Sequence, residues 1–175
     1  SAVVERDGTQ LYLAGADWAS PPAQLVAEFT AEPGPGGGDW LSTGPSQGNN
    51  TTHYWPPASL AWRDYELSGQ MVLGDAVGGI GITFYSQFPA GYDRYYRLRR
   101  YAGAPTLQIA PHGAEISAGD VDTGVDPLPG VPYQFLIRVE TGPDATRMMA
   151  KVWPAGEAEP AEWQADCYDD AAERL

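Results

Sequence analysis

The sequence predicts an all-β fold, with a single domain over residues 1–175 built as a two-sheet antiparallel β-sandwich. Three observations lead to this fold class. The chain has 175 residues, 43% of them hydrophobic, which is enough to bury a core without metals or disulfides. Its 21 glycines and 16 prolines are scattered, which indicates many short elements joined by turns. From residue 64 onward apolar residues recur at every second position, and no segment has a convincing helical period.

The individual strands follow from this alternation between turn residues. In residues 64–73, Tyr65, Leu67 and Met71 share one face, and in residues 133–140 Phe135 and Ile137 do the same. The strand candidates cover residues 9–15, 23–30, 64–73, 79–86, 93–101, 106–110, 133–140 and 146–153. A set of about eight or nine short strands is typical of a sandwich.

The segment 93–103, DRYYRLRRYAG, combines arginines and tyrosines in an otherwise acidic chain. Alternation places Tyr96 and Leu98 in the core. The residues expected to face outward are Tyr95, Arg97, Arg99 and Tyr101.

A long stretch at residues 31–59 is rich in Gly, Pro, Asn and Thr and contains Trp40 and Trp55. We expect a loop, because this composition does not form a regular helix. Loops of this length in compact domains are either functional or packed on the sheet through their own side chains.

The net charge of −13 argues against binding to nucleic acid or an anionic membrane, because long-range electrostatics would repel both. No run of 18 apolar residues is present, so no membrane insertion is expected.

Cys167 is the only cysteine, which excludes an internal disulfide. The first residues do not form a signal peptide, although a mature secreted chain would have lost one.

From Trp62 onward the order of several short motifs is informative. W-R-D-Y-E-L is followed by G-I-G-I-T-F, Y-Y-R-L, A-K-V-W-P-A-G and E-P-A-E-W. Over about residues 60–170 the chain resembles the concanavalin A-like or laminin-G-like jelly-roll domains of secreted bacterial proteins. The resemblance implies a jelly roll and an extracellular location. It leaves function open, because this fold hosts lectins, carbohydrate-binding modules, glycosidases, lyases and structural modules.

The end of the chain departs from this family, which usually closes with a G-x-x-G-V-W strand. The sequence ends instead with C-Y-D-D-A-A-E-R-L. Either the early strands complete the sheet, or the chain is part of a longer one, or a neighbouring domain or subunit donates the strand.

The catalytic motifs of related jelly rolls are missing from the sequence. Laminarinase-type glycosidases carry E-x-D-x-x-E on one strand, and alginate lyases carry R-x-E-x-R and Q-I-H strands. His53 and His112 are the only histidines, and we expect both in loops. The sequence therefore favours a non-enzyme that requires no cofactor, with a glycosidase or lyase of non-standard site as an alternative.

Calcium is the metal that the resemblance suggests, since related jelly rolls often carry one structural Ca²⁺ near the chain ends. Its candidate oxygen ligands are Asp17, Asp166, Asp169 and Asp170. The alternative, which the sequence favours, is that these residues form a solvated acidic surface.

Sugar recognition is the function that the outward-facing residues fit best. Sugar sites combine aromatic faces with a few placed polar groups that bond hydroxyls. The predicted carbohydrate-binding residues are Tyr85, Tyr95, Arg97, Arg99, Gln134, Arg138, Lys151 and Trp153. The alternative is ordinary cross-strand pairing, in which Arg97 and Arg99 contact Glu66 or Glu140.

These observations predict a non-catalytic extracellular module that binds a polysaccharide on its concave sheet. A different class remains open: a structural or adhesive subunit of an extracellular filament or virion surface. In that class, neighbouring domains or subunits would be the partners.

Overall fold

The regular secondary structure of the described residues is almost all antiparallel β-sheet, which confirms the predicted all-β class. The computed structural model describes residues 2–6, 9–13, 18–19, 29–33, 39–44, 50–54, 56–88 and 93–175. Within these residues the only helix is a short 3-10 helix over Pro57–Ala61. No described helix has the length and apolar character needed to cross a membrane.

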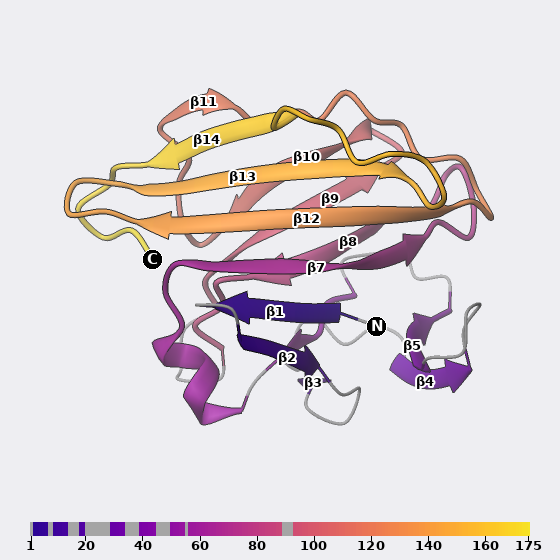
Figure 1. The fold of residues 1–175 in the computed structure, drawn as a ribbon, viewed down its shortest axis with the longest axis horizontal. Coiled ribbons are helices and arrows are strands. Elements are labelled where there is room, and N and C mark those ends of the chain that lie inside the picture. The colour runs from indigo at the N-terminus through magenta and orange to yellow at the C-terminus, as the bar shows by residue number, and fades with distance from the viewer. Residues whose placement is uncertain are drawn as a thin grey trace.

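The larger sheet has the strand order β11-β14-β13-β12-β7-β1-β2, with every neighbouring pair antiparallel (Figure 1). Its strands are β1 (Ala2–Arg6), β2 (Thr9–Leu13), β7 (Tyr65–Val72), β11 (Ala118–Asp120), β12 (Pro132–Thr141), β13 (Thr146–Pro154) and β14 (Ala165–Asp169). The predicted strand 9–15 corresponds to β2, and it extends the sheet beyond β7 through β1, which the sequence pattern did not predict.

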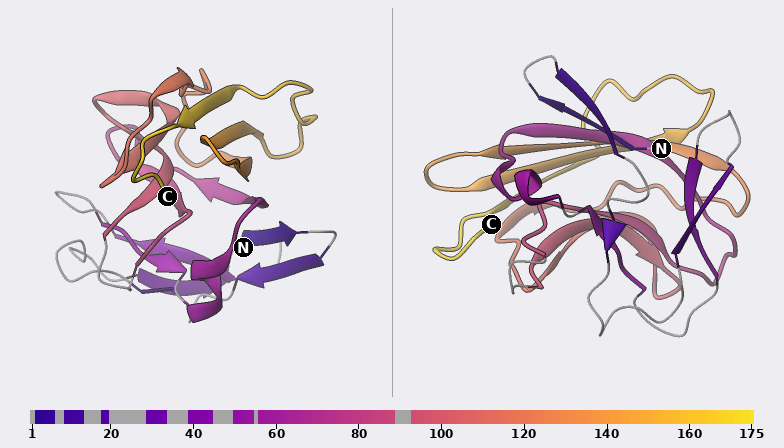
Figure 2. Two further views of the ribbon diagram at one scale, coloured as in Figure 1. Left: turned by 90° about the vertical axis from the view of Figure 1, so that its left-hand side faces the viewer. Right: turned by 90° about the horizontal axis from the view of Figure 1, so that it is seen from below.

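A second sheet lies behind the first in Figure 1 and has the order β10-β9-β8. Its strands are β8 (Ile80–Phe84), β9 (Tyr95–Tyr101) and β10 (Ala104–His112). Figure 2 (right) shows β12 and β13 in one layer and these strands in another. The arrangement is sandwich-like.

The hydrophobic core lies between the two layers and draws on both. In β7, β12 and β14 alternate residues are buried toward this core, as expected for strands with one core-facing side. The large sheet contributes Tyr65, Leu67, Met71, Tyr133, Phe135, Ile137, Val139, Met148, Ala150, Val152, Ala165 and Cys167. The second sheet contributes Phe84, Tyr96, Leu98, Leu107 and Ile109. The inward prediction for Tyr96 and Leu98 is thus confirmed, since neither is exposed.

The segment predicted as one long loop, residues 31–59, is more structured than expected. Two pairs of short strands include parts of it: β4 (Phe29–Pro33) with β5 (Asp39–Thr43), and β3 (Trp18–Ala19) with β6 (His53–Tyr54). Composition predicted loop because these short strands lie among Gly, Pro and polar residues and show no clear apolar alternation. Of the predicted strand 23–30, residues 23–28 lie outside the described residues.

Candidate functional site

The eight residues predicted to bind carbohydrate do not lie on one surface. Arg97 and Arg99 are on β9 in the second sheet, whereas Gln134 and Trp153 are on β12 and β13 in the large sheet. Because the two sheets share one core between them, outward-facing residues on one sheet point away from those on the other. The expectation of a single platform across these strands is wrong.

Tyr85 was expected to face outward but is buried. β8 ends at Phe84, and Tyr85 follows with a positive φ of 50°, which breaks the alternation. Its ring packs in the core, and its hydroxyl and the Thr141 hydroxyl are 2.8 Å apart. Tyr85 is therefore a packing residue.

Tyr95 faces away from the core, as predicted, yet its side chain is fully buried. Two imidazoles cover it: the His53 ring meets it edge-on at 4.7 Å, and the His112 ring stacks on it at 4.6 Å. His53 lies on β6, which is far from β9 in the sequence. This covering makes Tyr95 inaccessible to a polysaccharide.

On the large sheet, Lys151 is also covered. Its Nζ donates to Glu159 Oε1 at 2.8 Å and lies 4.9 Å from the Trp163 ring centroid. The Arg138 guanidinium lies 5.0 Å from the same ring, and Arg138 Nε donates to Glu66 Oε1 at 2.7 Å. The segment that carries Glu159 and Trp163 thus packs on the outer face of this sheet and engages both cations.

The other two candidates on that face, Gln134 and Trp153, are partly buried and lie opposite each other in register. The side-chain amide of Gln134 has no hydrogen bond within the described part of the chain.

The expected alternative for Arg97 and Arg99, pairing with Glu66 or Glu140, is also wrong. Glu66 binds Arg138, and Glu140 lies 3.5 Å from Arg147, both on the large sheet. The strand order places these carboxylates in the other layer, so they cannot reach β9.

Arg97 and Arg99 remain together on the outer face of the second sheet, where small neighbours leave them room. In register, Arg99 lies between Gly81 and Gln108, and Arg97 lies opposite Ala110. A Cβ placed on Gly81 would come within 2.7 Å of the Arg99 Cβ. The missing side chain at Gly81 therefore provides the space that Arg99 occupies.

Arg99 has the geometry of a binding group. Its guanidinium carbon lies 4.8 Å from the ring centroid of Tyr101, whose side chain is 49% exposed. Burial, together with the charge of Arg97, lowers the pKa of Arg99. Its Nη1 is buried and has no hydrogen-bond partner among the described residues. Such a donor costs about 1–3 kcal/mol unless another molecule bonds it.

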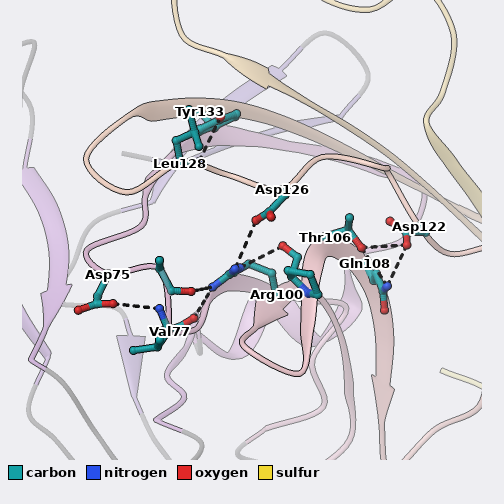
Figure 3. Close-up of polar contacts among 12 residues, drawn as sticks. Asp75, Val77, Arg100, Thr106, Gln108, Asp122, Asp126, Leu128 and Tyr133 are labelled. Atoms are coloured by element: carbon teal, nitrogen blue, oxygen red, sulfur yellow. Dashed lines mark hydrogen bonds and ion pairs between the residues drawn. The ribbon is translucent and has the colours of Figure 1, made fainter.

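Gln108 completes this surface with polar groups fixed by their neighbours (Figure 3). Its Nε2 donates to Thr106 Oγ1 at 3.1 Å and to Asp122 Oδ2 at 2.9 Å. Burial opposes ionisation of Asp122, but hydrogen bonds from Gly124, Thr106 and Gln108 outweigh it and lower the pKa of that carboxyl. Sequence reasoning missed Gln108, although its position between the inward Leu107 and Ile109 was a sufficient signal.

Arg100, the fourth arginine of the segment, has a structural role. Its guanidinium donates to the backbone oxygens of Ala76, Gly78 and Pro105 and contacts Asp126 at 3.3 Å (Figure 3). With a side chain only 4% exposed, it fixes the turn before β8 and takes no part in an outer surface.

The four candidate calcium ligands do not come together in the described structure. Asp17 lies outside the described residues. Asp166 faces outward and binds Arg147 at 2.6 Å, whereas Asp169 faces inward and accepts a hydrogen bond from the Tyr96 hydroxyl. Asp170 is exposed. Across the described ranges, no group of three or more His, Cys, Asp or Glu side chains could hold a metal ion.

The histidines, expected in loops, lie on β6 and β10. Ser86 Oγ is 3.0 Å from His53 Nδ1, which resembles part of a nucleophile–base pair. However, His53 Nε2 is buried without a hydrogen-bond partner, so no described carboxylate orients the ring as in a catalytic triad. Burial also raises the pKa of the Cys167 thiol to about 12, which keeps it protonated at neutral pH.

Comparison with known proteins adds no further constraint on these sites. No family model, no curated protein and no solved structure matches the chain. The outer face of the second sheet, defined by Arg97, Arg99, Tyr101 and Gln108, is therefore judged on its chemistry alone.

Proposed function

We propose that this chain is a non-catalytic module that acts outside the cell and binds a polysaccharide on the outer face of the second sheet. The observation that carries the proposal is Arg99, which stacks on the exposed Tyr101 ring and keeps a buried Nη1 without a partner. The Arg99 side chain is only partly buried, so a sugar hydroxyl or carboxylate can bond the accessible part of this guanidinium.

The chemistry of this face suits a sugar. The ring of Tyr101 can stack on the apolar face of a pyranose, while the guanidinium of Arg99 and the amide of Gln108 bond its hydroxyls. Arg97, two residues from Arg99 on the same strand, adds positive charge in a chain of net charge −13. This charge favours a glycan that carries carboxylate groups over a neutral one.

For the fold we propose a concanavalin A-like jelly roll, in which the second sheet is the concave one. Two antiparallel layers around one core, with the early strands beside β7, support this assignment. An experimental structure that resolves the connections between all strands tests it, and a different strand order would rule it out.

Binding is tested with a polysaccharide panel that includes neutral and uronate-containing glycans. We expect saturable binding, weakened at least about tenfold by Arg99→Ala or Tyr101→Ala, which corresponds to about 1.4 kcal/mol. Gln134→Ala and Trp153→Ala, on the opposite sheet, are matched controls and should bind as the wild type does. Circular dichroism confirms that each variant is folded. Absence of binding to every glycan contradicts the proposal, and loss only in the two controls moves the site to the large sheet.

A further inference from the structure

A second cationic site lies away from this face, in a cavity of about 220 Å³ that is lined by Arg63, Gln87, Arg94, Arg174 and Leu175. A single water needs roughly 10–15 Å³ of such space, so the cavity can hold a hydrated polyatomic ion. The three arginines come from separate segments: the residues after the 3-10 helix, the residue before β9, and the end of the chain.

Backbone carbonyl groups hold each of these guanidinium groups in place. Arg63 Nη1 donates to Trp62 O at 2.8 Å, and Arg94 Nε donates to Gly113 O at 2.7 Å. Arg174 Nη2 donates to Pro143 O at 2.5 Å. Carbonyl acceptors orient a guanidinium without neutralising it, so the site is preorganised and remains positively charged.

No carboxylate of the described residues forms an ion pair with any of the three. Asp64 and Glu173 are their neighbours in the chain, but the Asp64 carboxylate instead accepts a hydrogen bond from the Thr141 N–H at 2.6 Å. Other arginines of this acidic protein, such as Arg138 and Arg147, do pair with carboxylates. Three arginines without such partners around one cavity leave their positive charge available to an added anion.

Unused donors are present as well. Arg63 Nε and Nη2, Arg94 Nη1 and Arg174 Nε make no hydrogen bond within the described residues, and neither does the side-chain amide of Gln87. Arginine forks match the oxygen spacing of phosphate and sulfate in a bidentate manner.

We propose that this cavity binds a doubly charged tetrahedral oxyanion, either phosphate or sulfate. A doubly charged anion compensates the charge of three guanidinium groups more completely than a singly charged carboxylate does. The proposal does not depend on polysaccharide binding at the outer face of the second sheet.

The test is a titration with inorganic phosphate and inorganic sulfate at constant ionic strength, followed by calorimetry or, for phosphate, by ³¹P NMR. We expect saturable binding that Arg94→Gln and Arg174→Gln weaken at least tenfold. Gln87→Ala removes no hydrogen bond within the described residues, so this variant should fold as the wild type does even if the arginine variants do not. It should weaken anion binding severalfold. Arg99→Gln is the matched control and should leave the affinity unchanged.

Further arms identify the source of the anion and separate the two sites. Monomethyl phosphate, which can carry two negative charges as the free ion does, shows whether the site accepts an ester as well as the free ion. Equal or tighter binding of acetate would overturn the choice of a doubly charged anion, and unsaturable responses to phosphate and sulfate would overturn the site. Arg174→Gln should retain glycan binding, so a failure of either proposal is distinguishable from a failure of the other.

Discussion

The imidazole of His53 is buried between Tyr95 and Phe88, and this burial lowers its pKa to about 4 despite the opposing charge of Asp93. In the unfolded chain a histidine titrates near 6.5, so below that pH the unfolded state binds a proton that the folded state does not. We predict that the free energy of unfolding falls by up to about 3 kcal/mol as the pH drops from 6.5 to 4.

Urea denaturation of wild type and His53→Asn at pH 7, 5.5 and 4 measures this contribution. The variant should lose less stability over the interval, because it lacks the titrating group. His112→Asn serves as the control, since the His112 side chain is 31% exposed. An equal loss of unfolding free energy between pH 7 and pH 4 in wild type and His53→Asn would contradict the prediction.

The Tyr96 hydroxyl donates to the carboxylate of Asp169, and neither residue is exposed. Burial and the hydrogen bond to Asp169 raise the pKa of Tyr96, so the hydroxyl stays protonated and continues to donate. Tyr96→Phe leaves a buried carboxylate oxygen without this donor, and we predict a loss of about 1–3 kcal/mol in unfolding free energy. Tyr101→Phe, at an exposed position, should change it by less than about 0.5 kcal/mol. Equal effects of the two substitutions would show that Asp169 does not depend on Tyr96.

At this scale the sequence predicted which way a side chain points better than whether it is accessible. Alternation placed Tyr95 and Tyr96 on opposite faces of β9 correctly, yet both are buried. His53, more than 40 residues earlier in the chain, covers Tyr95, and no local pattern encodes that contact.

At the scale of elements, close approach of β8 and β9 depends on Gly81. A Cβ at this position would meet the Leu98 carbonyl oxygen and the Arg99 Cβ. We predict that Gly81→Ala destabilises the fold by about 1–3 kcal/mol, as overpacking does in well-packed regions. It should also weaken glycan binding, because it displaces Arg99.

Gly74→Ala is the control for that substitution, since a Cβ at Gly74 meets no atom within 4 Å. Its unfolding free energy should lie within about 1 kcal/mol of the wild type. Chemical denaturation measures the unfolding free energy of both variants. If Gly81→Ala is as stable as Gly74→Ala, β8 can shift without a loss of stability and the prediction is wrong.

Elements with clear alternation were predictable, including the five-residue strand β8, whereas most of the other short strands were not. The pattern identified the strands that became β7, β9, β12 and β13, each at least seven residues long. It did not identify β14, whose acidic residues suggested a surface cluster instead. Nor did it predict that Trp163 packs between Arg138 and Lys151, because a residue outside the strands carries that contact.

At the scale of the whole molecule, alternation assigns faces within a strand but not strands to sheets. Residues on β9 and β12 follow the same pattern, yet they belong to different layers. The predicted carbohydrate site was therefore divided between two surfaces, and only the part on the second sheet keeps an exposed aromatic ring beside its arginines. Long-range strand order depends on packing between layers, which a single sequence does not display.

The core that joins the two layers leads to a prediction about cooperativity. Leu98 on β9 and Ile137 on β12 are both fully buried in it. If one core stabilises both sheets, Leu98→Ala and Ile137→Ala should each lower the unfolding free energy by about 2–5 kcal/mol. Each variant should still unfold in one transition, because neither sheet retains a buried face without the other. Leu128→Ala, at a position 61% exposed, should have little effect.

Far-ultraviolet circular dichroism and tryptophan fluorescence, followed through the same denaturant titration, test this prediction with two independent probes. Coincident curves that shift together in both core variants are the expected result. Two separate transitions, with Leu98→Ala shifting one and Ile137→Ala the other, would mean that the sheets are stabilised independently. A binding face on the second sheet would then depend on the stability of β8–β10 alone, whereas a shared core makes its rigidity a property of the entire fold.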